Sequence, residues 1–498
     1  MNPKFEELMQ HVEKMQALGA AMTLFGWDAE TGAPADSMEM TSRIVGSLSS
    51  QYFEAMVNEE VRTLLMELKS AEDLDEIQAA IVRDMVKNLE DMEKIPPEEY
   101  REFSELQAKS TTVWTKAKQN NDFASFVPTL EQIIAYTKKF AGYSRKDGQS
   151  LYDSMLNDYE ETFVQDVLDP FFAGLKEKIV PLLKQVVAKN DQIDKSPLQQ
   201  SFDVDKQREL NHWLAEYVGF DFNRGILAES EHPFTTGLHN HDVRITSHYY
   251  EDAMESAIFS TIHEAGHAIY EMNVADDLTL TPVGGGASCG MHESQSRFME
   301  NMIGRSYEFW DPIYAKVQEM FPEQLGQVSL EHFHKMINKV EPGLIRTESD
   351  ELTYCLHVLI RYEIEKEMID GELAVEDLPS IWNEKYEAYL GVKPESDTMG
   401  VLQDIHWSQG SIGYFPSYAL GNAFAAQIYH TMEQELDIQG ALRNGQLPII
   451  TNWLKEKIHR HGMIKKSRQL LKEITGEDFN PQYYIDYLTD KFTEIYGL

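Results

Sequence analysis

The chain has 498 residues, of which 83 are acidic and 44 are basic, so its formal net charge at pH 7 is −39. A negative charge of this size argues against nucleic acids and anionic membrane surfaces as partners. The two cysteines, Cys289 and Cys355, provide no disulfide framework, and we expect both to be buried as small apolar side chains in a reducing compartment.

Apolar residues at helical spacing dominate the N-terminal part of the chain. The predicted helices cover residues 4–25, 38–70, 72–93, 98–120 and 124–142. Prolines and short polar turns separate them, and the polar stretch 189–200 is the best linker candidate. Clear hairpin signals are few, so we predict a mostly α-helical fold.

The N-terminal sequence does not resemble an export signal. Residues 1–16 are amphipathic and charged, and they lack the unbroken apolar core of a signal peptide. No run of about 18 apolar residues occurs anywhere in the chain. We therefore expect a cytoplasmic protein.

One segment of the chain has the pattern of a β-strand. Within Asp242–Ser247, Val243 and Ile245 alternate with charged or polar residues. This alternation predicts a strand with one buried face.

The sequence His263-Glu264-Ala265-Gly266-His267 lies in the next predicted helix. Residues four apart share a helix face, so the two imidazoles can point at one tetrahedral metal ion while Glu264 flanks the bound water. An apolar stripe on the opposite side of the helix consists of Met254, Ile258, Ile262, Ala265 and Ile269. The spacing predicts the metal site of a peptidase, and two ordinary surface histidines are the alternative.

A third metal ligand is expected from the following helix, after the flexible Gly284-Gly285-Gly286. Glu293 is the favoured ligand, because a third ligand carried on a second helix is the usual arrangement in zinc peptidases of this type. Two histidines and one carboxylate would leave the fourth zinc position open for water. His292 is the competing ligand. A glutamate that only complements the helix dipole is the simpler interpretation of Glu293.

An arginine is suited to bind a substrate carboxylate, because its planar guanidinium donates two parallel hydrogen bonds. Arg346, at a predicted helix start, is the preferred candidate for this role, and Arg244 is the alternative. The polar face of the predicted helix consists of Arg346, Asp350, Thr353 and His357. Such a face is often merely solvated. Asp350 is also a candidate for orienting a metal-bound imidazole.

A last polar cluster spans residues 403–416 and contains several glycines that permit close backbone approach. His406 and Tyr414 offer hydrogen-bond donors for the oxyanion of a tetrahedral intermediate, and Tyr414 is the preferred candidate. The alternative for either residue is a buried aromatic ring with a satisfied polar tip.

Five short signatures, in this order, resemble those of the carboxypeptidase Taq family of metallocarboxypeptidases. They are His232-Pro233-Phe234, Asp242-Val243-Arg244-Ile245-Thr246, His292-Glu293-Ser294-Gln295, Ile345-Arg346-Thr347-Glu348-Ser349-Asp350 and Gly400-Val401-Leu402-Gln403-Asp404-Ile405-His406-Trp407. The opening Gly26-Trp27-Asp28 also resembles the family. Ser349 stands where the family usually has alanine, and it is not a proposed ligand.

The resemblance implies a zincin-type helical metallopeptidase with a deep substrate cleft and a small β-sheet near the metal helix. It implies that residues 1–498 form one domain. Within it, a helical part of about residues 1–200 lines one side of the cleft, and 201–498 carries the metal and substrate motifs. The predicted strand is expected to pair with extended substrate.

The activity implied by the resemblance is hydrolysis of the C-terminal peptide bond, which releases single amino acids with broad specificity. Glu264 is then the catalytic base, Tyr414 and His406 stabilise the oxyanion, and Arg346 binds the substrate carboxylate. Arg244 and His232 are further candidates for substrate binding. The metal ligands are His263, His267 and Glu293.

The cofactor implied by this assignment is one divalent ion per chain, zinc by preference, with cobalt as an alternative. The implied partners are peptides with a free C-terminus and a second copy of the chain in a homodimer. A related helical zinc endopeptidase or dipeptidyl carboxypeptidase is the alternative function. A non-catalytic helical binding protein is a further alternative.

Overall fold

The computed structural model describes residues 2–498 and confirms a mostly helical fold with one small sheet. The chain forms two compact units, each built from separate stretches of sequence. The first unit comprises residues 2–90, 195–334 and 428–476, and the second comprises residues 91–194, 335–427 and 477–498. The prediction of a single domain, divided near residue 200, stays a prediction.

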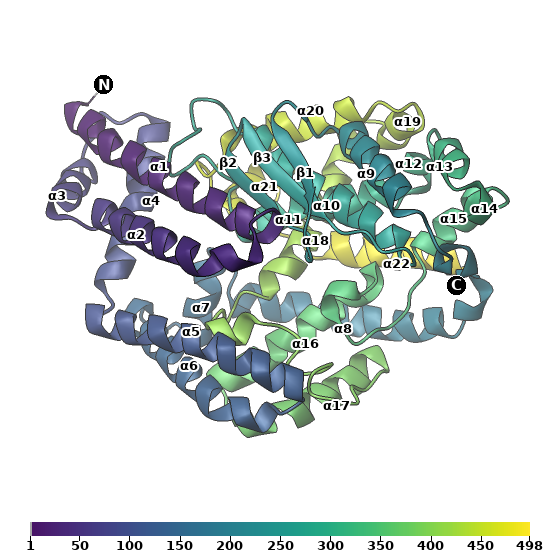
Figure 1. Ribbon diagram of the computed structural model, residues 1–498, viewed down its shortest axis with the longest axis horizontal. Coiled ribbons are helices and arrows are strands. Elements are labelled where there is room, and N and C mark those ends of the chain that lie inside the picture. The colour runs from purple at the N-terminus through teal and green to yellow at the C-terminus, as the bar shows by residue number, and fades with distance from the viewer. Residues whose placement is uncertain (1) are drawn as a thin grey trace. The chain divides into compact units, whose positions relative to one another are not determined.

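The first unit contains the N-terminal helices, the sheet and the helices that follow it (Figure 1). The helices that lie mainly in this unit are α1 (Pro3–Thr31), α2 (Met38–Met56), α3 (Glu59–Leu68), α4 (Glu76–Glu93), α9 (Val204–Val218), α10 (Met254–Met272), α11 (Cys289–Arg297), α12 (Tyr307–Trp310), α13 (Tyr314–Met320), α14 (Pro322–Leu325), α15 (Leu330–Ile337), α19 (Ile438–Arg443), α20 (Leu447–Lys457) and α21 (Ser467–Thr475). A π-helix, η4 (Phe298–Gly304), directly continues α11.

The second unit is entirely helical in the residues that the structure describes. Its helices are α5 (Pro97–Asn120), α6 (Phe123–Ser144), α7 (Leu151–Tyr159), α8 (Gln165–Val187), α16 (Glu351–Ile369), α17 (Leu378–Leu390), most of α18 (Pro416–Glu435) and α22 (Gln482–Tyr496). Two short 3₁₀ turns, η5 (Arg346–Glu348) and η7 (His406–Gln409), carry predicted site residues.

The predicted helix over residues 38–70 is wrong, because the structure has two helices there. The chain leaves helical geometry at Val57 and Asn58, and the Asn58 side chain accepts a hydrogen bond of 2.9 Å from the Val61 amide. Asparagine is a preferred helix N-cap for this reason. The other four predicted helices exist, and each of their ends lies within six residues of the predicted one.

The sheet has three strands, β1 (Gly225–Glu229), β2 (Thr235–His239) and β3 (Asp242–Ser247), in the order β1-β3-β2. The predicted strand is confirmed as β3, with Val243 and Ile245 fully buried. Helix α10 packs against β3 and β2, so the sheet lies beside the metal-binding sequence (Figure 1).

The expectation that β3 pairs with substrate is wrong. β3 is the central strand, paired in parallel with β1 and antiparallel with β2, so both of its edges already carry ladder hydrogen bonds. The alternation of apolar residues indicates that one face of the strand is buried, but it does not indicate which strands lie at the edges of the sheet. Of the two edge strands, β2 contacts α10 through Thr235.

Three further expectations concern the linker, the cysteines and the membrane. The predicted linker over residues 189–200 contains the point, between 194 and 195, at which the chain passes from the second unit to the first.

Cys355 is buried as expected, but Cys289 is exposed at the first residue of α11, and no disulfide joins them. Within residues 2–498, no helix combines the length and apolarity needed to cross a bilayer.

Candidate active site

Helix α10 carries the two histidines and Glu264, and most of its other residues are buried. The predicted apolar stripe on α10 is confirmed, because each of its five side chains is at most 4% exposed. The rings of His263 and His267 lie 4.9 Å apart, and both are partly exposed. The helix therefore buries its apolar face and directs both imidazoles away from it.

Gly266 brings helix α11 close to the two histidines. A Cβ atom at residue 266 would lie 2.7 Å from both the Gln295 carbonyl oxygen and the Ser296 Cα, so a side chain has no room there. Only glycine permits this approach of two backbones. The contact involves the C-terminal part of α11 and places Glu293, less than one turn earlier, beside the histidine pair.

Glu293 faces both histidines. Its Oε2 lies 3.4 Å from His267 Nε2 and 3.7 Å from His263 Nε2, and the three donor atoms lie within 4.8 Å of one another. Two imidazole nitrogens and one carboxylate oxygen suit a divalent ion such as zinc and leave a coordination position open. The residues present therefore fit a catalytic metal.

His292 is less suited to be a ligand, because both of its ring nitrogens already have partners. Its Nδ1 lies 2.5 Å from His267 Nδ1, and its Nε2 lies 2.7 Å from Glu271 Oε1. This chain of contacts holds the His267 ring through the nitrogen that faces away from Glu293. The geometry favours Glu293 over His292 as the third ligand.

Further charged residues contact His263 and Glu293 on the sides that face away from the cluster. Glu300, in the π-helix, lies 2.9 Å from His263 Nδ1, and Arg297 forms ion pairs with both Glu293 and Glu300. Burial alone would raise the pKa of Glu293, but the Arg297 guanidinium and His263 hold it well below its usual range. Burial lowers the pKa of His267 to about 3. Both groups are thus in the forms that bind metal cations.

Glu264 is in a different electrostatic environment on the same helix. Its side chain is buried, and its Oε2 accepts a hydrogen bond of 2.6 Å from Thr235 Oγ1 in β2. Burial raises the pKa of Glu264 above its usual value. A carboxylate with a raised pKa next to a metal site suits proton transfer near neutral pH.

Arg346 lies in the second unit, and its predicted place in a helix is wrong. It belongs to the separate turn η5, and α16 begins only after Asp350, which caps it by accepting a hydrogen bond of 3.0 Å from the Thr353 amide. The helical-wheel argument therefore does not apply to Arg346. Asp350 serves as this cap, and the carboxylate beside the His263 imidazole is Glu300.

Arg346 belongs to a buried cluster of three charged residues, which are two arginines and one aspartate. Its guanidinium bonds to Asp404 Oδ1 at 2.9 Å, and Arg361 bonds to the other oxygen of Asp404. Burial opposes ionisation, yet the two guanidinium groups hold the pKa of Asp404 below its usual range. The two cations and one anion leave an excess positive charge, which favours a further anion.

His406 and Tyr414 lie in one aromatic group in the second unit. Their ring centroids are 5.5 Å apart, and His406 Nε2 lies 3.3 Å from the Tyr418 hydroxyl. Burial lowers the pKa of His406 to about 4, so its imidazole is neutral at pH 7. Tyr414 is partly exposed and packs edge-on against Tyr159.

The other two predicted substrate-binding residues lie in the first unit. Arg244 donates two hydrogen bonds of 2.8 Å to the two oxygens of Asp242 and lies over the Trp27 ring. Its fork is thus occupied by a neighbouring carboxylate. The His232 side chain is exposed, and its carbonyl oxygen accepts a hydrogen bond from Ser230.

The family model described as carboxypeptidase Taq (M32) metallopeptidase matches residues 7–492. The chain belongs to this family. It is 43% identical over 495 residues to Carboxypeptidase 1 of Bacillus subtilis (strain 168), and 35% identical over 494 residues to Thermostable carboxypeptidase 1 of Pyrococcus furiosus. Each alignment covers 99% of both chains.

Solved structures of M32 carboxypeptidases have the same fold as this chain. The crystal structure of M32 carboxypeptidase from Deinococcus radiodurans R1 matches with a TM-score of 0.97 and 36% identity over the whole of both chains. The structure of Pyrococcus furiosus carboxypeptidase matches with a TM-score of 0.95 and 35% identity over 99% of both chains. The chain is thus a metallocarboxypeptidase, a peptide hydrolase that uses a divalent metal.

Several polar contacts of the candidate site residues were not predicted from the sequence. Thr235, Arg297 and Glu300 contact the metal-site residues, and Arg361 pairs with Asp404. The contact of Glu300 could have been predicted, because Glu300 follows Glu293 by seven residues and therefore lies near the same helix face. Thr235 and Arg361 had none, because their partners lie 29 and 43 residues away.

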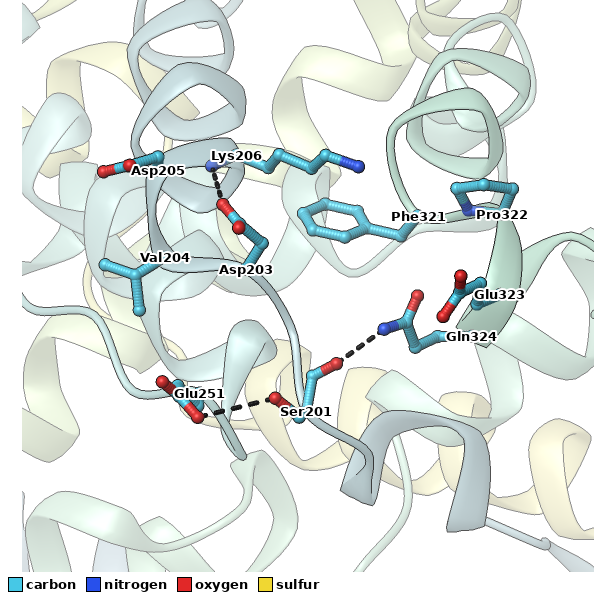
Figure 2. Close-up of a pocket in the computed structure, with 10 residues that line it drawn as sticks. All are labelled: Ser201, Asp203, Val204, Asp205, Lys206, Glu251, Phe321, Pro322, Glu323 and Gln324. Carbon is cyan, nitrogen blue, oxygen red and sulfur yellow. Dashed lines mark hydrogen bonds between the residues drawn. The ribbon is translucent and has the colours of Figure 1, made fainter.

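A pocket elsewhere in the first unit of this M32 chain contains none of the predicted site residues (Figure 2). It lies at the start of α9, and its charged lining consists of Asp203, Asp205, Glu251, Glu323 and Lys206. Four acidic groups against one lysine disfavour the binding of a free carboxylate. This pocket is therefore not assigned to the peptide C-terminus.

Proposed function

We propose that the protein removes single amino acids from the C-termini of peptides, using one zinc ion held by His263, His267 and Glu293. The observation that carries this proposal is the convergence of these three donor atoms within 4.8 Å, next to the buried Glu264. A bound divalent ion supplies a Lewis acid that polarises the scissile carbonyl and makes water acidic.

Glu264 acts as the base and then as the acid. Its Oε2 is held by Thr235, so Oε1 takes the proton of the attacking water and returns it to the departing amine. Tyr414 and His406 donate hydrogen bonds to the oxyanion, and the neutral state of His406 suits it to act as a donor.

Arg346 binds the substrate carboxylate in this proposal. The excess positive charge of the Arg346, Arg361 and Asp404 cluster supports this role over Arg244, whose fork is already paired with Asp242. His232 contributes to substrate binding at the exposed loop before β2. We propose that extended substrate pairs with the outer edge of β2, since this strand also contacts Glu264.

The remaining properties rest on family membership. We propose a zincin-type fold with a deep cleft, broad residue specificity, a homodimer, a cytoplasmic location, and peptides with a free C-terminus as partners, without nucleic acid or membrane. Cobalt is the alternative metal. The related endopeptidase or dipeptidyl carboxypeptidase is not favoured, because the family and its named relatives are carboxypeptidases.

The test is digestion of a peptide and its C-terminally amidated twin, with products identified by mass spectrometry. Wild type should release single residues from the free peptide only, and chelation should abolish release. Arg346→Ala should lower kcat/KM for the free peptide by about 10- to 100-fold, the size expected for one charged hydrogen-bonding group. Arg346→Lys keeps the positive charge but loses the planar guanidinium. Its kcat/KM should therefore lie between those of wild type and Arg346→Ala.

Arg244→Ala is the matched control and should keep the preference for the free peptide. If Arg244→Ala loses that preference and Arg346→Ala keeps it, the assignment of the carboxylate site is wrong. Release of dipeptides, or cleavage of the amidated twin, would contradict the carboxypeptidase proposal itself.

A further inference from the structure

Glu365, on α16, is a fully buried carboxylate that the mechanism above does not use. It accepts three hydrogen bonds. The Trp407 indole donates to Oε1 at 2.8 Å, and the Gly413 amide and the Tyr152 hydroxyl donate to Oε2, each at 2.9 Å. All four residues belong to the second unit.

Two of these donors flank the residues proposed to stabilise the oxyanion. Trp407 follows His406, and Gly413 precedes Tyr414. We infer that Glu365 is a positioning residue that fixes His406 and Tyr414 together, by holding the adjacent residue of each on one of its two oxygens. This inference rests on the proposed roles of His406 and Tyr414.

The backbone around Gly413 shows that this segment has little freedom of its own. Gly413 has a φ of +92°, and a Cβ atom there would lie 3.0 to 3.1 Å from the backbone of Met155 and Leu156. The amide of Gly413 is thus presented to Glu365 from a conformation that other residues rarely adopt.

Helix α16 also contacts the segment 404–414 through a second residue. Arg361, one turn before Glu365, bonds to Asp404 near the start of the segment. Arg361 and Glu365 are four residues apart and so share a helix face. Residues 404, 407 and 413 are therefore all anchored to one face of α16, and Tyr414 immediately follows the last anchor.

The chemistry of the donors explains why residue 365 must be a carboxylate. An indole N–H and a backbone N–H can only donate, so both oxygens must accept. A glutamine has the same shape, but either orientation of its amide directs an NH₂ group at one of these two donors. Glu365→Gln therefore leaves a buried donor unsatisfied and shifts the residue next to His406 or Tyr414.

The experiment measures kcat, KM, zinc content and thermal stability for Glu365→Gln and for Glu363→Gln. Glu363 lies two residues earlier on α16, where it pairs with Lys176 and Lys385 outside the proposed site. Glu365→Gln should lower kcat by about 10²-fold, as expected for a small misplacement of reacting groups. Its KM and zinc content should stay close to those of wild type, and Glu363→Gln should match wild type in all four measurements.

A double variant with Tyr414→Phe separates positioning from general damage. If Glu365 acts through Tyr414, the double variant should be slowed by much less than the product of the two single effects. Trp407→Phe removes one donor and keeps the carboxylate, and it should also lower kcat. It replaces Glu365→Gln as the test if that variant does not fold.

The outcomes distinguish this inference from the proposed function. A slow Tyr414→Phe with a wild-type kcat for Glu365→Gln would overturn the inference alone. Multiplicative effects in the double variant would also overturn it. A wild-type kcat for Tyr414→Phe would overturn the proposed role of Tyr414, and with it this inference.

Discussion

Glu264 and Glu293 are buried carboxylates on neighbouring helices, yet their surroundings shift their pKa values in opposite directions. Burial raises the pKa of Glu264, whose Oε2 accepts a hydrogen bond from the neutral Thr235 hydroxyl. Burial also acts to raise the pKa of Glu293, but the guanidinium of Arg297 and the nearby His263 lower it by more, so the net shift is downward. Separation of this kind supports the proposed roles, proton transfer by Glu264 and metal binding by Glu293.

Replacement of Glu264 by glutamine should leave the metal bound and abolish turnover. The amide keeps the hydrogen bond from Thr235 but cannot take a proton from water. Single-turnover assays together with zinc analysis by mass spectrometry measure both properties. Turnover near the wild-type rate in a zinc-loaded Glu264→Gln sample would rule out its role as the base.

Glu300→Gln should weaken metal binding while keeping the ligands themselves. Glu300 contacts the His263 nitrogen that faces away from Glu293, and loss of such a partner typically lowers metal affinity by about 10- to 100-fold. Titration with a competing zinc chelator gives the affinity directly. Glu319→Gln, on α13, is the control and should bind zinc as wild type does. Equal zinc affinity in Glu300→Gln and wild type would contradict the role.

Asp404 should make stability depend on pH in the acid range. Its pKa is lowered in the folded state, so its contribution is present above the ordinary pKa near 3.8 and is lost as the pH falls toward the folded value. Asp404→Asn leaves two buried guanidinium groups unpaired and should cost about 3 to 5 kcal/mol at pH 7. The Tm difference between wild type and the variant should shrink steadily below pH 4, and a constant difference would contradict this.

The sequence was informative at this scale where residues act through short spacing. The pair His263 and His267 needed only the helical period, and Glu293 needed one further helix. Contacts such as Thr235 with Glu264, or Arg361 with Asp404, depend on tertiary packing and left no local pattern. Cys289 was mispredicted because composition favours buried cysteines but does not reveal the exposed end of a helix.

At the level of helices and strands, the sequence predicted elements from their periodicity but missed the helix ends that are set by capping side chains. β3 and α10 follow from the periods of their apolar residues. The break at Asn58 did not, because an asparagine within an amphipathic pattern is read as helix interior unless its side chain is known to cap. The 3₁₀ turn at Arg346 was missed for the same reason, since Asp350 is the actual cap of α16.

Asp350→Ala should therefore destabilise α16 by about 1 kcal/mol, the usual cost of losing an N-cap. The carboxylate accepts bonds from the Thr353 amide and hydroxyl and from the Glu341 amide. Asp377→Ala is a matched control, because Asp377 precedes α17 without a capping hydrogen bond. Denaturant unfolding measures both, and equal losses in the two variants would contradict the capping role.

At the level of the whole molecule, grouping of distant segments was beyond sequence reasoning. Residues 428–476 belong to the same unit as the N-terminal helices, and Lys466 pairs with Asp84 at 3.0 Å across 382 positions. Helical periodicity extends over one element and cannot report such partners. The family resemblance, in contrast, predicted the small sheet near the metal helix, because it uses motifs spread along the chain.

Metal should stabilise the folded chain, since the three ligands converge only after α10 and α11 have packed together. A ligand at 100 times its dissociation constant adds about 2.7 kcal/mol to stability. Calorimetry with zinc and with a chelator should show a higher Tm in zinc. Glu293→Ala should lose most of this difference, and a Tm that is independent of zinc in wild type would contradict the site.

The missing side chain at residue 266 has a consequence for how the protein acquires its ion. Because the main chains of α10 and α11 touch there, the spacing between the two ligand-bearing helices is set by backbone contact. The cation does not have to draw those helices together. Loading of metal would then require only small rotations of three side chains, and the packing of the two helices around the site would stay as it is.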